Sequence, residues 1–171
     1  FVSQNLGAKQ YDRAKRGARF SILLAVICAE IIGIVVYFSA NQLIGFFDST
    51  EQVLAFGVKQ AHIVALFYFL LSYSHSVAAV CRGAGKAFVP MTIMLSVWCV
   101  FRITYISVVT HFFDIIDVIY WAYPLTWAIS SVIYLIYYIK SDWVHGFDKA
   151  RPPGNNDPPA ANSAKDGIKQ H

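Results

Sequence analysis

KQYDRAKRGARFSILLAVICAEIIGIVVYFSA, residues 9–40, is the stretch that decides the fold class. Five cations precede Phe20, and between Phe20 and Ala40 the only charged side chain is Glu30. An α-helix rises about 1.5 Å per residue, so about 20 consecutive apolar residues can cross the hydrocarbon core of a bilayer. Residues 20–40 therefore predict a transmembrane helix that begins directly after a basic segment.

Three further apolar segments of similar length follow along the chain. They run from Gln60 to Val80, from Phe88 to Thr110 and from Val118 to Ile139. The composition agrees, because 57% of the residues are hydrophobic and only 14% are charged, whereas soluble domains average about 25% charged residues. We therefore expect an all-α integral membrane protein in which residues 20–140 form a domain of four transmembrane helices.

The charges at the ends of these segments alternate in sign. The cations are Lys9, Arg13, Lys15, Arg16, Arg19, Arg82, Lys86, Lys140, Lys149 and Arg151; the acids of the opposite connections are Asp48, Glu51, Asp114 and Asp117. The positive-inside rule then places both chain ends in the cytoplasm of a multi-pass protein of the inner (plasma) membrane. The net charge of +4 fits attraction to lipid headgroups, so we expect the lipid bilayer and no nucleic acid as a partner.

The flanking segments have their own signatures. Residues 1–19 are expected to be cytoplasmic, and Gly7 to Arg19, with three alanines and five cations, predicts a helix lying along the membrane interface. Residues 141–171 are predicted to form a cytoplasmic tail, disordered from Ala150 to His171 because this part is polar and rich in Pro. The three cysteines show no paired spacing, so we expect neither a disulfide framework nor a metal site.

Three separated motifs carry a family resemblance. They are VSQNLGAK at residues 2–9, RGAGKAFVPM at residues 82–91 and YPLTW at residues 123–127. In order and spacing they resemble the multidrug and toxic compound extrusion (MATE) transporters, in which a Gln-Asn-x-Gly-Ala signature follows the second helix of each six-helix lobe. The resemblance covers about Phe1 to Trp143. It implies helices nine to twelve of a twelve-helix transporter, nearest to bacterial DinF-type and related pumps, with the first eight helices missing from this chain.

The signature and hinge residues of the first two motifs are Gln4, Asn5, Gly7, Ala8, Arg82, Gly83, Gly85 and Pro90. The first four can end one helix and let the next begin at close range, and a gating role is the alternative to this capping role. The next three fit a tight cytoplasmic turn, and the proline can start the following helix at little cost. A phosphate-binding loop is not expected, since no Ser or Thr follows Lys86 and the preceding element is a membrane helix.

Ionisable residues within the apolar segments mark candidate functional sites, because a charge in hydrocarbon is costly. Glu30 lies mid-way along the first segment, His75 in the cytoplasmic half of the second, and Arg102 in the outer half of the third. Glu30 and Arg102 lie at similar depths, so they can form an ion pair if their helices adjoin. The alternatives are separate snorkelling and solvation in a cavity.

Polar residues recur at helical spacing on the second and third segments. Tyr68, Ser72 and His75 share one face of the second segment, and Ser96, Cys99 and Arg102 form a thinner stripe on the third. These faces can line a substrate cavity, for which the candidates are Tyr68, Ser72, His75, Ser96 and Arg102. Packing between helices through small and hydroxyl side chains is the equal alternative.

Pro124 interrupts the fourth segment, where it removes a helix hydrogen bond and predicts a kink. Such a kink can be static, or it can help one lobe bend during alternating access.

The resemblance implies secondary active efflux of varied, mostly cationic organic compounds, driven by inward sodium or proton movement, with no cofactor and no covalent chemistry. Members of the NorM type carry a coupling Asp in the tenth helix, whereas the corresponding segment here, residues 60–80, contains no acid. Coupling is then expected at an Asp in the missing first lobe, as in DinF-type members, with Glu30 as the local candidate.

Two other functions remain as alternatives. A lipid-linked saccharide flippase of the same superfamily would share the helical plan, but it would need more cavity cations than Arg102 to hold a pyrophosphate. A membrane-embedded enzyme could use His111, Asp114 and Asp117, but this short outer loop contains no evident nucleophile. We therefore expect a transporter and no enzyme.

Overall fold

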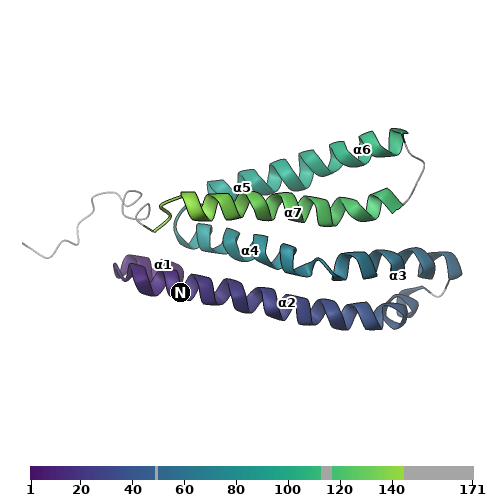
Figure 1. Cartoon of the computed structure of the whole chain (residues 1–171), viewed down its shortest axis with the longest axis horizontal. Helices are drawn as coiled ribbons and strands as arrows, with labels where there is room; N and C mark the ends of the chain where they lie inside the picture. The colour runs from purple at the N-terminus through teal and green to yellow at the C-terminus, as the bar shows by residue number, and fades with distance from the viewer. Residues whose placement is uncertain (49, 113–116, 145–171) are drawn as a thin grey trace, which may run out of the picture.

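A computed structural model describes residues 1–48, 50–112 and 117–144 (Figure 1). The helices, in chain order, are α1 (Val2–Gly7), α2 (Tyr11–Phe47), α3 (Glu51–Ala65), α4 (Tyr68–Gly83), α5 (Phe88–Met94), the π-helix η1 (Leu95–Phe101), α6 (Arg102–Phe112) and α7 (Asp117–Lys140). The described residues contain no β-strand. This confirms the expected all-α class.

Three of the helical segments are long and apolar enough to cross a membrane: α2, the continuous run of α5, η1 and α6 over Phe88–Phe112, and Ile119–Lys140 of α7. The fourth expected span differs from a simple helix. Its residues belong to α3 and α4, which meet at an angle of 55° across a break at Leu66 and Phe67. The two helices form one span only if the bent pair crosses the bilayer together.

Figure 1 shows the start of α2, the end of α4 and the end of α7 together at one end of the bundle. We call this the basic end, because it carries Lys15, Arg19, Arg82, Lys86 and Lys140. The connection between α2 and α3 lies at the opposite, acidic end, with Asp48 and Glu51. The alternation of charge along the sequence thus becomes a separation in space. Lys149, Arg151 and Asp114 lie outside the described residues.

The basic segment before the first span is helical and continuous with that span. The chain turns at Ala8–Gln10, with Lys9 at a positive φ of 56°, and α2 then runs unbroken from Tyr11 through the whole first span. Ala14 and Ala18 are fully buried against Trp143 and Val144. The segment from Tyr11 to Arg19 is thus the first part of α2, and its position along the membrane interface stays a prediction.

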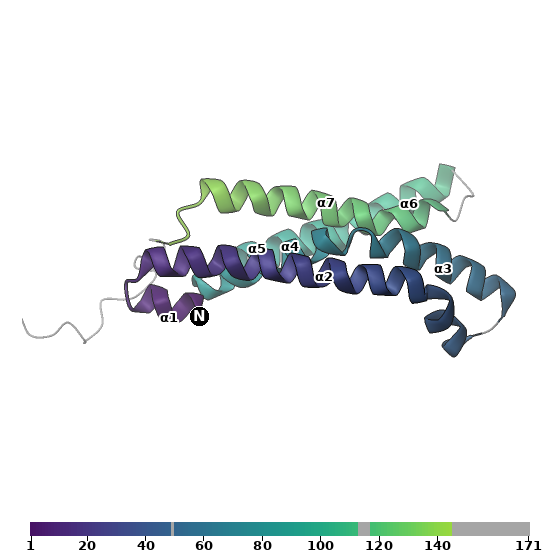
Figure 2. The ribbon, with the colours of Figure 1, turned by 60° about the horizontal axis from the view of Figure 1, so that its bottom comes forward.

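The core lies along α4, which packs against α2 on one side and α7 on the other (Figures 1 and 2). On the α7 side, Val77, Ala78 and Cys81 surround the fully buried ring of Tyr134. The Tyr134 hydroxyl donates to the carbonyl oxygen of Pro90 at 3.2 Å. Small residues on α4 therefore let the neighbouring helices approach closely, as is usual between membrane helices.

Hydrogen bonds also fix the connection at the acidic end. The backbone N–H of Thr50, which precedes α3, donates to Oδ1 of Asp48 at 2.8 Å. The hydrogen bonds from the Thr50 side chain and backbone hold the pKa of the Asp48 carboxyl below its ordinary value. An ionised Asp48 therefore stabilises the turn between α2 and α3.

Candidate functional site

The bend between α3 and α4 lies directly against α2. At the bend, Phe67 N–H donates to the Val64 carbonyl and Leu70 N–H to the Phe67 carbonyl, both at 3.1 Å, so the chain tightens locally. Gly33 of α2 faces this bend: a Cβ atom added there would lie 2.6 Å from the Ala65 carbonyl oxygen. Only glycine permits this approach of α2 to the backbone of the bent pair.

Glu30 lies three residues before Gly33, so it shares the face of α2 that meets the bend. Its side chain is half-buried, and Oε2 is shielded from solvent with no hydrogen-bond partner among the described residues. A shielded carboxylate oxygen in a membrane span is costly unless a proton, a cation or a donor satisfies it. Glu30 is thus an unsatisfied acidic group next to a broken helix.

Arg102 takes its partners from α7 and from its own segment. Nη2 donates to the hydroxyl oxygen of Thr126 at 2.6 Å. The guanidinium carbon lies 4.6 Å from the ring centre of Tyr123 and 5.6 Å from that of Trp98. Both rings are placed to attract the cation. Thr126 is fully buried and donates to its own helix at the Ala122 and Tyr123 carbonyls, so it is held in place as an acceptor.

The possible ion pair between Glu30 and Arg102 is therefore absent. The guanidinium is held by α7 and by the π-helix η1, which ends at the residue before Arg102. The aromatic rings in this cluster already hold a cation of the protein itself. They do not form a free aromatic wall for a cationic compound.

The other cavity candidates are divided between two places. His75 of α4 contacts the same cluster, with its ring edge-on to Trp98 at 5.2 Å. Tyr68 lies at the bend, where its ring is 6.3 Å from that of Trp127 and close to Gly33. Ser72 is half-buried, whereas Ser96 is exposed. The stripe of polar residues therefore joins the bend to the Arg102 cluster, with Ser96 at its margin.

A cluster of three serines, which the sequence analysis did not single out, joins α4 to α7. Ser74 Oγ lies 3.1 Å from Ser130 Oγ and 2.9 Å from Ser131 Oγ, and all three residues are buried. Ser74 and Ser131 both donate to the Leu70 carbonyl at 3.0 Å. The adjacent hydroxyls at 130 and 131 in an apolar segment were the available signal, since buried hydroxyls in membrane helices usually find partners across the interface.

Comparison with known proteins identifies the family. The sequence profile of the family described as MatE matches residues 1–108, more than half of the chain. This chain belongs to the MatE family. The resemblance to multidrug and toxic compound extrusion transporters is thereby confirmed, and the helical segments are those of a membrane transporter of this family.

One curated relative of this MatE chain is a protein of Bacillus subtilis (strain 168) named "Probable multidrug resistance protein YoeA". It is 25% identical over 140 residues, which cover 81% of this chain and 30% of the relative. The chain thus spans about 30% of the length of that relative. No solved structure matches the chain significantly. The finer likeness to DinF-type pumps stays a prediction.

The MatE signature at the start of the chain forms α1 and the turn after it. Asn5 is buried, and its Nδ2 donates to the Phe1 carbonyl at 2.8 Å, while its own carbonyl accepts from Gln10 N–H at 2.8 Å. Gln4 is exposed, and its carbonyl accepts from Ala8 N–H at 3.0 Å. Gly7 has open space at its Cβ position. The carbonyls freed at the end of α1 are thus satisfied by backbone N–H groups of the turn, and the capping role of Gln4, Asn5, Gly7 and Ala8 stays a prediction.

The second motif forms the turn between α4 and α5 at the basic end. Gly85 has a positive φ of 78°, which explains the glycine, and Arg82 is exposed. Gly83 packs against Val2 of α1, where an added Cβ would lie 3.3 Å from the Val2 side chain. Pro90 is buried in the first turn of α5, where its missing N–H costs little.

Pro124 of the third motif is buried within α7, which continues through it as an α-helix. Of the outer-loop residues considered for catalysis, His111 is exposed at the end of α6, edge-on to Phe112. Asp114 lies outside the described residues, as does the side chain of Asp117. Lys59, an exposed cation of α3 beyond the acidic connection, was not considered in the sequence analysis.

Proposed function

We propose that the protein is a secondary active exporter of organic compounds, mostly cationic, which it moves out of the cell in exchange for sodium ions or protons. Membership of the MatE family and the similarity to a protein named as a multidrug resistance protein support this function. We further propose that it resides in the plasma membrane with the basic end in the cytoplasm, because cations gather at that end of the bundle.

The unsatisfied Glu30 carboxylate supports the proposal that this residue binds the coupling ion. Transporters commonly bind their coupling ions where a helix is broken, since its freed carbonyls and a nearby acid together offer oxygen ligands. Here Gly33 of α2 contacts the bent pair beside the break at Leu66–Phe67, and Glu30 lies three residues before it on the same helix. A proton on Glu30, or a sodium ion between its carboxylate and the bend, would satisfy the shielded oxygen.

Arg102 limits where a cationic compound can bind. Its guanidinium occupies the faces of Tyr123 and Trp98, so a second cation there would meet a like charge. We therefore propose that cationic compounds bind outside the Arg102 cluster, along the part of α4 that carries the exposed Ala79.

Efflux of ethidium from drug-sensitive cells that express the full-length protein tests this function. The sodium and proton gradients are collapsed separately while membrane insertion is checked by immunoblot. Efflux that stops when one gradient is removed would establish an antiporter and identify its ion. If the protein is correctly inserted and the cells still retain ethidium whichever gradient is present, the result would contradict the proposal and favour the lipid-linked saccharide flippase.

A further inference from the structure

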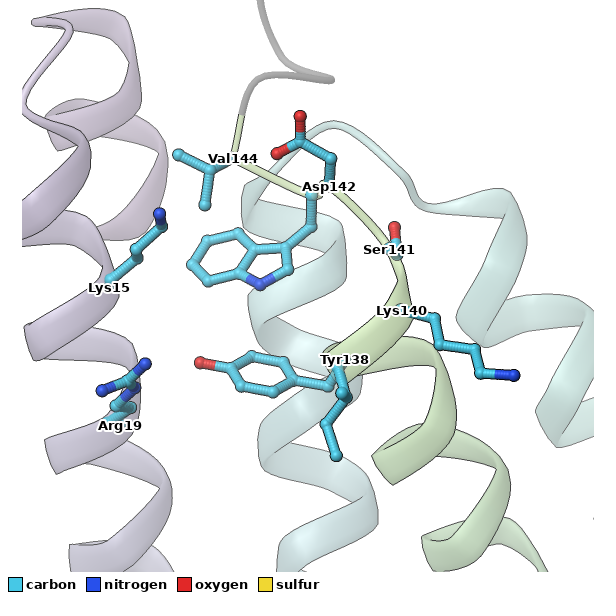
Figure 3. A pocket seen from close by; sticks show the side chains of 9 residues that line it. Lys15, Arg19, Tyr138, Lys140, Ser141, Asp142 and Val144 are labelled. Carbon is cyan, nitrogen blue, oxygen red and sulfur yellow. The ribbon is translucent and has the colours of Figure 1, made fainter.

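A cavity of about 480 Å³ opens at the basic end between α2 and the last turn of α7 (Figure 3). Its lining includes Lys15 and Arg19 of α2, Tyr138 and Lys140 of α7, and the following residues Asp142 and Trp143. None of these residues takes part in the bend or in the Arg102 cluster. The cavity is therefore separate from the site proposed for transport.

Two cations and a hydroxyl face into this cavity. Lys15 and Arg19 are four residues apart and share one face of α2. Figure 3 shows Lys15 and Arg19 on the side of α2 that borders the cavity, and the Tyr138 hydroxyl of α7 points at the guanidinium of Arg19. Arg19 and Tyr138 lie within hydrogen-bonding reach of one another. All three groups can donate hydrogen bonds to the same oxygen-rich anion.

The floor of the cavity is aromatic and firmly packed. The rings of Tyr138 and Trp143 stack with centroids 5.6 Å apart. Trp143 is only 5% exposed and belongs to the core cluster that also holds Ala14 and Ala18. Aromatic side chains of this kind gather at the level of the lipid headgroups. The donors are thus held on a rigid support at the depth of the membrane interface.

The local charge is positive. Lys86 adds a cation beside the lining, since its Nζ donates to Ser141 Oγ at 3.2 Å and to the Asp142 carbonyl at 3.4 Å. The one acid of the lining, Asp142, has its carboxylate at the rim, directed away from Arg19, and Lys140 points away from the cavity (Figure 3). An anion held at Arg19 would therefore not face the Asp142 carboxylate.

Apolar side chains continue from the cavity toward the membrane on both helices. Ile139 lines the cavity and is 71% exposed, and Phe20, in the turn after Arg19, is 66% exposed. A free phosphate ion would leave these surfaces uncovered. A molecule with an anionic head and apolar tails would cover both the cations and the apolar side chains.

We propose that this cavity binds the phosphate of an anionic phospholipid, such as phosphatidylglycerol, from the leaflet at the basic end. Basic pockets between transmembrane helices on the cytoplasmic side hold such headgroups through charge complementarity. Lys15 and Arg19 bind the phosphate, the Tyr138 hydroxyl donates to it, and the acyl chains lie along α2 and α7. The bound lipid would thus contact both α2 and α7.

Native mass spectrometry of the full-length protein, with phosphatidylglycerol and phosphatidylcholine supplied in equal amounts, tests this site. We expect preferential retention of phosphatidylglycerol. The double substitution Lys15→Gln and Arg19→Gln should weaken that retention by about tenfold or more, because each cation contributes substantially to the attraction of an anionic lipid. Tyr138→Phe keeps the stacked ring and should weaken it less.

The matched control replaces Arg13→Gln and Arg16→Gln, which removes two charges from the same helix outside the cavity. Retention of phosphatidylglycerol by this control supports the site. Equal losses in both double variants would show diffuse surface attraction and overturn the proposal, as would equal retention of the two lipids by the unchanged protein. Displacement of the lipid by inorganic phosphate, but not by chloride at the same ionic strength, would assign the site to free phosphate and also overturn it.

Discussion

At the scale of single residues, Arg102 is held by one buried acceptor, the hydroxyl of Thr126. Thr126 Oγ1 lies 2.6 Å from Arg102 Nη2 and is fully buried. Thr126→Val keeps the shape but removes the acceptor, so the cation loses its hydrogen bond while it remains in the span. We expect the free energy of unfolding to fall by about 1.5–3 kcal/mol, the usual range for a hydrogen bond to a charged group. The change is measured as a lower thermal midpoint of the full-length protein in detergent.

Thr104→Val is the control for that substitution. Thr104 is an exposed threonine of α6 whose hydroxyl bonds only the Val100 carbonyl of its own helix, at 2.8 Å. It should change stability by less than about 0.5 kcal/mol. Equal midpoints for the Thr104 and Thr126 variants would show that the contact between Arg102 and Thr126 contributes nothing measurable.

Gly33 provides a second test at this scale. An added Cβ would lie 2.6 Å from the Ala65 carbonyl oxygen, which belongs to backbone and cannot rotate away. Gly33→Ala should therefore destabilise the protein by about 1–3 kcal/mol, as overpacking does in cores. Thermal unfolding followed by circular dichroism measures the change.

Gly45 is the matched glycine on the same helix. An added Cβ there would meet Leu54 Cδ1 at 3.7 Å, an ordinary contact. Because alanine is favoured over glycine within a helix by about 0.5–1 kcal/mol, Gly45→Ala should be neutral or stabilising. A Gly33 variant as stable as the Gly45 variant would refute the close approach of α2 to the bend.

At the scale of helices, the serine cluster holds α4 against α7. Ser74 interacts with both Ser130 and Ser131. Ser74→Ala removes this junction and leaves two buried hydroxyls with fewer partners. We expect destabilisation of about 0.6–1.7 kcal/mol, between the average and the largest value measured for hydrogen bonds between membrane helices. Ser96→Ala, at an exposed position, serves as control; if its midpoint fell as far as that of Ser74→Ala, the cluster would not be a junction.

The sequence predicted most of the helical plan, and the departures have identifiable causes. Residues 20–40, 88–110 and 118–139 all fall within single helical segments, because long apolar runs specify helices strongly. The break at Leu66–Phe67 was not predicted, since neither residue is Pro or Gly and hydropathy does not register a bend. The burial of Ala14 and Ala18 was not predicted either, because a run of cations does not indicate which of its small residues pack into a core.

The sequence named several candidate residues, but it did not predict which of them contact one another. Glu30, His75 and Arg102 were found because ionisable residues stand out in apolar segments. The partners of Arg102 were missed: Thr126 and Tyr123 are ordinary residues of a motif, and only the packing of α6 on α7 brings them to the guanidinium. Glu30 and Arg102 lie at similar depths, which made an ion pair possible. The pair does not form because Arg102 packs on α7, and depth along the sequence does not show which helices are neighbours.

At the scale of the whole molecule, the bent pair of helices links the proposed functions. α4 begins at the bend, where Tyr68 lies close to Gly33, and it meets the Arg102 cluster through His75 and α7 through the serine cluster. A change of charge at Glu30 would therefore act next to the element that contacts each of these regions. We propose that this is how ion binding influences the transport path.

The most direct test is gradient-driven uptake of ethidium into proteoliposomes that contain the full-length protein, with Glu30→Gln compared against Glu51→Gln. Glu51 is exposed at the acidic end and should leave transport unchanged. Glu30→Gln can neither release a proton nor neutralise a sodium ion. This variant should still bind ethidium, but its gradient-driven transport rate should be at least about tenfold lower. Full gradient-driven transport by the Glu30 variant would contradict coupling at this residue.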